Sequence, residues 1–151
     1  MDINIRPALM EDVDAVKDRL RYEDSQEVIA TGAGIEDELR ESVKRSTLCF
    51  CVDIDGNQAA LFGVVPQTLL SARARVWLLG TDDLAKVRKT FVKMSRVYVA
   101  RFLRLYPVLW NCVDVRYKKA INWLMAIGAD FSSETIGGPL HKFYLFEIRR
   151  V

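Results

Sequence analysis

The sequence predicts a single domain of the α/β (α+β) class, built on a mixed central sheet flanked by helices. Two apolar strand patterns, 48–54 and 59–65, are separated by an Asp-Gly dipeptide at 55–56, which is typical of an antiparallel hairpin. After residue 75, strand patterns alternate with long helical patterns, which favours parallel pairing of the later strands. The chain has 151 residues, enough for one hydrophobic core, so we expect one domain over residues 1–151.

Each expected element follows from a local pattern. Strands come from short runs rich in β-branched and aromatic residues, and helices from apolar residues three or four positions apart. The expected elements are strand 3–6, a helix from 11, helices 23–30 and 35–45, strands 48–54, 59–65 and 75–81, helix 84–106, strand 108–113, helix 117–127 and strand 142–148.

Proline, glycine and charge set the boundaries of these elements. Pro7, Pro66 and Pro107 end them, because proline continues neither a strand ladder nor a helix. Gly128 is placed to stop the helix before it. The stretch Ile136-Gly137-Gly138-Pro139 predicts a flexible turn ahead of the last strand.

Composition and charge indicate which broad classes of protein the sequence fits. Half of the residues are apolar and 28% are charged, as in ordinary globular proteins. No apolar run reaches the roughly 18–20 residues that span a bilayer, and the N-terminal segment lacks the pattern of a secretion signal. Residues 1–46 hold 12 acids and 7 bases, whereas residues 47–151 hold 8 acids and 15 bases. This asymmetry indicates either pairing of the two halves within one fold or a charged interaction partner.

The cysteine and histidine content predicts neither disulfides nor a metal. Cys49, Cys51 and Cys112 form no CxxC pair, which indicates reduced thiols. Cys49 and Cys51 share one face of an apolar strand, where cysteine usually acts as a small hydrophobe. His141 is the single histidine, so the residues do not predict a zinc site.

Several segments, spread over nearly the whole chain, resemble the GNAT superfamily of N-acetyltransferases. The resemblance rests on three groups of residues: Ile5-Arg6-Pro7-Ala8 with Asp12; the hairpin at Asp55-Gly56 with Leu61-Phe62-Gly63-Val64; and Val113, Ala120, Ile121, Trp123, Leu124 and Gly128. The resemblance implies a GNAT-like fold in which the segment 109–131 lies against the acyl-thioester arm of acetyl-CoA. It also implies N-acyltransferase activity as one candidate function.

A narrower resemblance is to small GNAT-like proteins encoded by tailed phages, including internal virion proteins of short-tailed phages. It is carried by Val76-Trp77-Leu78-Leu79-Gly80-Thr81, by Tyr106-Pro107 with Leu109, Asn111 and Val113, and by Trp123-Leu124 with Ile127-Gly128. This resemblance implies a virion-associated structural or assembly protein, made in the host cytoplasm and then incorporated into the virion. Its implied partners are other virion proteins or further copies of itself.

The expected cofactor site departs from the GNAT pattern. GNAT enzymes hold the pyrophosphate of acetyl-CoA on a Gln/Arg-x-x-Gly-x-Gly/Ala loop that opens the long helix. Here Asp82 and Asp83 stand in that loop, and we expect their carboxylates to cap the helix and repel an anion. If acetyl-CoA binds, the resemblance leaves six contact residues: Leu79, Gly80, Thr81, Lys86, Arg88 and Asn111.

The expected catalytic groups are also replaced. The tyrosine that protonates the leaving thiolate in many GNAT enzymes corresponds here to Leu124, which has no proton to give. An asparagine common at the start of that helix is replaced by Tyr117, which is either a substitute acid or an aromatic residue packed on the core. Glu23, Glu27 and Asp53 qualify as bases by residue type alone. We therefore assign no catalytic residue.

The long helix carries an unbalanced cationic face. No acidic residue occurs between positions 84 and 113. The cations follow steps of three or four residues and are Lys86, Lys89, Lys93 and Arg96, with Arg104 extending the row. This row is either a solvated helix side or a surface for an anionic partner, which would be nucleic acid packed nearby or an acidic protein surface such as residues 11–41 of another copy. No nucleic-acid recognition motif occurs.

Three functions follow from these patterns. The first is a phage structural or assembly protein without catalysis and without a cofactor. The second is an N-acyltransferase that uses acetyl-CoA through an atypical site, which rests on analogy of fold. The third is a small binding module for another ligand.

Overall fold

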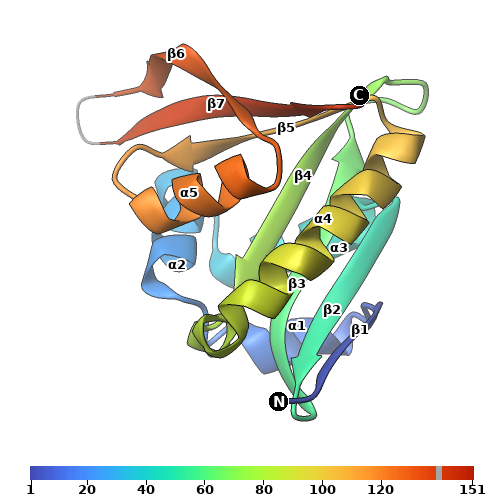
Figure 1. The fold of residues 1–151 in the computed structure, drawn as a ribbon. Helices are drawn as coiled ribbons and strands as arrows, with labels where there is room; N and C mark the ends of the chain where they lie inside the picture. Colours follow the sequence, from blue (N-terminus) through green and yellow to red (C-terminus); the bar gives the residue numbers. More distant parts are fainter. Residues whose placement is uncertain (139–140) are drawn as a thin grey trace. The chain divides into compact units, whose positions relative to one another are not determined.

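The computed structural model describes residues 1–138 and 141–151 and has a mixed α/β fold, as predicted (Figure 1). The strands are β1 (Ile3–Pro7), β2 (Leu48–Ile54), β3 (Asn57–Pro66), β4 (Arg73–Gly80), β5 (Val108–Asp114), β6 (Asp130–Gly137) and β7 (Lys142–Arg149). The helices are α1 (Glu11–Val16), α2 (Tyr22–Ala30), α3 (Ile35–Arg45), the 3-10 helix η1 (Asp82–Val87), α4 (Arg88–Leu105) and α5 (Lys118–Ala126).

Hydrogen bonds link the strands in the order β1-β2-β3-β4-β5-β7-β6. The predicted hairpin is the antiparallel β2–β3 pair, which turns at Asp55 and Gly56, both with positive φ. Strands β4 and β5 pair in parallel, with Arg73 opposite Val108, and α4 provides the crossover that parallel neighbours need. Strand β7 is antiparallel to both β5 and β6, so the predicted parallel pairing is confined, among the described pairings, to β4 and β5.

Strand β6 is an element that the sequence analysis did not predict. It lies at the sheet edge and is mostly exposed, so its sequence DFSSETIG lacks the apolar alternation of a half-buried strand. Ile136 and Gly137, predicted as part of a turn, belong to this strand, whereas Pro139 lies outside the described residues.

The predicted helix 84–106 is interrupted near its start. Residues Asp82–Val87 form the 3-10 helix η1, and the α-helix proper begins only at Arg88. Helical periodicity does not separate these two geometries over a single turn. The helix ends at Leu105, directly before Tyr106 and Pro107, as expected for a residue pair that disfavours the helical conformation.

The described residues group into two compact units. The first unit consists of residues 1–65 and 76–88, and the second consists of residues 66–75 and 89–151. In the first unit, α1 and α3 lie behind strands β2 and β3 in Figure 1. Val13 and Leu39 of these helices pack in one core cluster with Leu61 and Trp77 of the sheet. The Trp77 indole N–H donates to Ser46 Oγ at 2.8 Å, so its polar atom is satisfied. The single domain expected over residues 1–151 stays a prediction.

The second unit has an aromatic core between its helices and strands. Phe91 of α4 stacks on Trp123 of α5, with ring centroids 5.7 Å apart. Phe102, which lies further along α4, is fully buried. Phe131 of β6 packs against Phe146 of β7. Gly128 ends α5 with φ +101°, as predicted for a C-terminal glycine.

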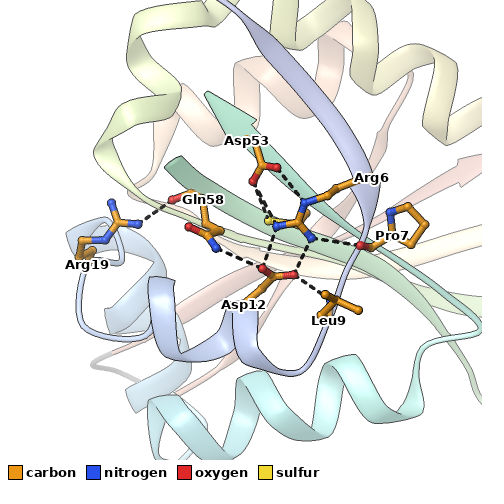
Figure 2. Close-up of polar contacts among 8 residues, drawn as sticks. Arg6, Pro7, Leu9, Asp12, Arg19, Asp53 and Gln58 are labelled. Atoms are coloured by element: carbon orange, nitrogen blue, oxygen red, sulfur yellow. Dashed lines mark hydrogen bonds and ion pairs between the residues drawn. The ribbon is translucent and has the colours of Figure 1, made fainter. Parts of the chain in front are cut away.

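A buried ion-pair network holds the N-terminal strand to the hairpin in the first unit (Figure 2). The Arg6 guanidinium donates to both carboxylate oxygens of Asp12, at 2.9 and 2.8 Å, and to Asp53 at 2.8 Å. The Leu9 N–H and the Gln58 amide also donate to Asp12. Burial alone would raise the pKa of Asp12, but these hydrogen bonds outweigh it and lower that pKa. This network gives Asp53 a structural role.

The cysteines behave as predicted from their strand position. Cys51 is fully buried and Cys49 partly buried in the first unit, and all three cysteines are free thiols. Burial, followed by the nearby Asp12 charge, raises the pKa of Cys49 to about 12, so it is not an activated nucleophile at neutral pH.

Within residues 1–138 and 141–151 no group of three metal-ligating side chains occurs. No helix of this part of the chain is long and apolar enough to cross a membrane.

Candidate functional site at the end of strand β4

The site lies in the first unit, where β4 ends at Gly80 and the chain turns into η1. The backbone here is docked onto the connection between α1 and α2. The Arg21 N–H donates to the Gly80 carbonyl at 2.8 Å, and Leu20 forms a β-bridge with Thr81. The Leu84 side chain covers the α-carbon of Gly80 so closely that a β-carbon there would lie 2.5 Å from it. A larger residue at this position would therefore have to displace the Leu84 side chain.

A buried carboxylate takes up the last N–H of β4. The Gly80 N–H donates to Asp24 Oδ2 at 2.7 Å, across 56 residues of sequence. Asp24 is itself held by the guanidinium of Arg21, with Nη2 to Oδ2 at 2.9 Å. Burial raises the pKa of Asp24, although Arg21 and the Gly80 N–H both favour its charged form. The protein thus places its own carboxyl group on the amide that ends the strand.

Thr81, and neither aspartate, caps the helical segment, which corrects the prediction that Asp82 and Asp83 do so. The Thr81 hydroxyl accepts from the Asp83 N–H at 3.3 Å and donates to the Ala59 carbonyl at 2.9 Å. The prediction failed because threonine is also a preferred N-cap residue and stands one residue earlier, where its hydroxyl reaches the Asp83 N–H.

The carboxylates of the η1 turn are nevertheless paired with cations of the protein itself. The Asp83 carboxylate lies 2.9 Å from Lys86 Nζ and 3.6 Å from Arg19 Nη1. Asp82 is exposed beside it. The start of η1 therefore holds two negative charges, one of them bound to Lys86, and this arrangement disfavours a bound phosphate.

The six predicted cofactor contacts fall into two groups. Leu79, Gly80, Thr81 and Lys86 lie together on β4 and η1, and Arg88 follows as the exposed first residue of α4. Asn111 lies on β5 in the second unit, where its side-chain oxygen accepts from the Cys112 N–H at 2.7 Å. Their role as cofactor contacts stays a prediction.

The residues considered as a catalytic acid or base lie at α5, on α2 and on β2, outside the turn from β4 into η1. Tyr117 stands at the start of α5, and the Arg116 guanidinium lies 5.6 Å from its ring centroid. Leu124, in the position of the expected acid, is buried in the second unit. Glu23 is exposed on α2 next to Asp24.

Asp24 and Arg21 are the site residues that the sequence analysis missed. Their separation from Gly80 along the chain gives no local signal, and an Arg-x-x-Asp pattern at the start of a helix is common. The contact arises only when the α1–α2 connection docks on the end of β4.

A pH titration of variants tests whether Asp24 is a buried anion. Its folded pKa is raised, so its contribution to stability is largest below the unfolded value of about 3.9 and is lost as the pH rises through the folded pKa. Asp12 has a lowered folded pKa, so its contribution to stability is present above the unfolded value and is lost as the pH falls through the folded pKa. We expect Asp24→Asn to gain stability relative to wild type as the pH rises from about 4 to 7, and Asp12→Asn to lose stability relative to wild type as the pH rises from about 1 to 5. Urea unfolding at each pH measures both, and parallel profiles would contradict the assignment.

Comparison with known proteins gives one match to a family model. The model described as "Bacteriophage T7, probable scaffold protein Gp13" matches residues 65–136. This segment runs from the end of β3 to β6 and includes the site at the end of β4. No curated protein matches the chain at a significant level.

Solved acetyltransferase structures match nearly the whole chain. The ribosomal-protein-alanine N-acetyltransferase from Brucella melitensis has a TM-score of 0.73 at 12% identity, over 97% of this chain and 99% of that one. AAC(6')-Ib in complex with ribostamycin and coenzyme A has a TM-score of 0.69 at 12% identity, over 99% and 94%. An acetyltransferase of the GNAT family from Streptococcus pneumoniae has a TM-score of 0.67 at 11% identity, over 98% and 99%.

The fold is that of the GNAT N-acetyltransferases. At such identities the likeness establishes the fold alone, because unrelated functions share common folds. The fold prediction is confirmed, whereas the narrower resemblance to internal virion proteins stays a prediction, with the family-model match as a link to phage proteins.

Proposed function

We propose that this chain is a structural or assembly protein of a phage virion that uses the GNAT fold as a scaffold and carries out no catalysis. One observation carries the proposal: the end of β4 is satisfied by groups of the protein itself. Asp24 holds the Gly80 N–H, and Leu84 fills the space over its α-carbon. A ligand that needs this backbone would have to displace a buried carboxylate.

The charge at η1 supports the same conclusion. A pyrophosphate is stabilised by unpaired N–H groups and positive charge at a helix start. Here Asp83 sits at that position and already binds Lys86, one of the cations that a phosphate would need. The site therefore favours self-pairing over the binding of a nucleotide anion.

The family-model match supports a role in phage assembly, because it covers β4, η1 and α4. We propose other virion proteins or further copies of the chain as partners. We also propose one domain over residues 1–151, synthesised in the host cytoplasm and then incorporated into the virion.

The second candidate function is an acetyl-CoA-dependent N-acetyltransferase with an atypical cofactor site. It is favoured by Arg88, an exposed cation at the first residue of α4, and by the GNAT fold itself. In that case Leu79, Gly80, Thr81, Lys86, Arg88 and Asn111 would contact the cofactor.

A thermal-shift titration with acetyl-CoA separates the two functions. A ligand present at about 100 times its dissociation constant stabilises the folded state by about 2.7 kcal/mol. We expect no shift of the melting temperature at about 1 mM acetyl-CoA, because the β4 amide and the η1 turn are self-paired. AAC(6')-Ib, solved with coenzyme A, serves as the positive control.

The double variant Lys86→Ala/Arg88→Ala shows where a shift would come from. A wild-type shift that the variant abolishes would establish a cofactor site at η1 and overturn the proposal. A shift that the variant retains would overturn it as well, by placing acetyl-CoA elsewhere on the chain.

A further inference from the structure

The two compact units carry opposite charge. Residues 1–65 and 76–88 hold 16 acids and 9 bases, a balance of −7. Residues 66–75 and 89–151 hold 4 acids and 13 bases, a balance of +9. Each unit therefore carries a strong net charge that can attract a partner of the opposite charge.

The second unit also exposes two adjacent leucines on a well-defined turn. Leu69 and Leu70 are 99% and 98% exposed in the loop between β3 and β4. The turn is closed by a hydrogen bond from the Ser71 N–H to the Thr68 carbonyl at 3.2 Å. Ser71 Oγ also donates to the Arg73 carbonyl at 2.8 Å. Central turn positions usually hold Gly, Pro, Asn or Asp, and these two leucines bury almost no apolar surface within the chain.

This turn lies at the same end of the second unit as the last turn of α4. The Val108 N–H donates to the Ala72 carbonyl, and the Arg150 guanidinium donates to the Leu103 and Arg104 carbonyls. Figure 1 shows the C-terminus beside this loop and the end of α4. We define the leucine end as Leu69, Leu70 and Leu105 with the exposed Arg104. It combines large apolar side chains with positive charge.

Helix α2 in the first unit presents the complementary chemistry. Tyr22 and Ile29 are seven residues apart, share one helix face, and are 69% and 54% exposed. Glu23 is exposed beside Tyr22, and the helix contains no basic residue. We define the α2 face as Tyr22, Glu23 and Ile29. It combines large apolar side chains with negative charge.

We propose that the chain associates with itself head to tail, with the leucine end of one copy on the α2 face of the next. Charge complementarity and the exposed apolar residues on both surfaces carry this inference. A phosphate backbone would use the positive charge but would leave the leucines in water, so the observations favour a protein partner. Because the two surfaces differ, the contact is heterologous and repeats into rings or open chains, a geometry suited to assembly. The inference rests on the proposed assembly role.

Sedimentation velocity of the wild type gives the first result. We expect the apparent mass to rise with protein concentration at about 0.05 M salt and to fall at about 0.5 M, because salt screens the attraction between the units. A wild type that stays monomeric at both salt concentrations overturns the proposal. If such a monomer binds duplex DNA, the partner of the basic unit is nucleic acid instead.

Two variants test the head-to-tail geometry. Leu69→Asp/Leu70→Asp removes the leucine end, and Glu23→Lys/Ile29→Lys removes the α2 face. We expect each alone to weaken association by at least about tenfold. Mixed together, the two variants should form a 1:1 dimer that grows no further. The first variant keeps only the α2 face, and the second keeps only the leucine end.

The control is Met125→Asp, which changes another exposed apolar residue of the second unit and should associate like wild type. If either double variant still associates fully, or if the mixture stays monomeric, the proposed contact is wrong. Neither outcome involves acetyl-CoA. Failure of this inference is therefore distinguishable from failure of the proposed function, which depends on the cofactor titration.

Discussion

Replacement of Arg6 by methionine is expected to destabilise the protein by about 3–5 kcal/mol, the cost of leaving a buried carboxylate without its partner. Asp12 is 1% exposed and receives two hydrogen bonds from the Arg6 guanidinium. Among the described residues, removal of that cation leaves the charge with the Leu9 N–H and the Gln58 amide as donors. Urea unfolding followed by circular dichroism measures the loss.

Two further variants identify the cause. Arg6→Met/Asp12→Leu removes both charges and should recover much of the lost stability, because an apolar pair often replaces a buried ion pair at little cost. Arg19→Met removes a more exposed arginine that donates to the Gln58 carbonyl, and should cost less than about 1 kcal/mol. An Arg6→Met variant as stable as wild type would show that the network in Figure 2 contributes little.

Truncation of Phe102 to alanine is expected to cost about 3–5 kcal/mol in the second unit. Its side chain is 1% exposed on α4, and the loss combines transfer of the ring to water with the cavity left behind. Thermal and urea unfolding measure the change.

Val97→Ala on the same helix is the matched control. Val97 is an exposed α4 residue, so its truncation should change stability by no more than about 0.5 kcal/mol. Equal effects of the two substitutions would mean that burial of Phe102 on α4 contributes little to stability.

Both stability predictions concern the scaffold, whereas the proposed function is that this scaffold binds no acetyl-CoA. A buried carboxylate such as Asp24 costs desolvation energy, which is offset here by the Gly80 N–H and Arg21. A cofactor bound through the same amide would have to displace this buried carboxyl group. This is the physical basis for proposing a non-catalytic role on an acetyltransferase fold.

Local patterns in the sequence determined most of the elements and the core. Helix 35–45 and strand 48–54 were predicted with the bounds observed for α3 and β2. The Asp-Gly hairpin and the stop at Gly128 were also predicted, because each depends on backbone preferences of the residues present. Edge strand β6 was missed, since an exposed edge needs no apolar alternation.

The candidate site was only partly determined by the sequence. The sequence located two acids at the start of the long helix, where repulsion of a phosphate follows from charge alone. Only the tertiary structure decided that Thr81 is the cap, and that Asp24, 56 residues away, takes the Gly80 N–H. A hydrogen bond between distant segments depends on how the α1–α2 connection docks on β4, and that docking leaves no periodic signal in the chain.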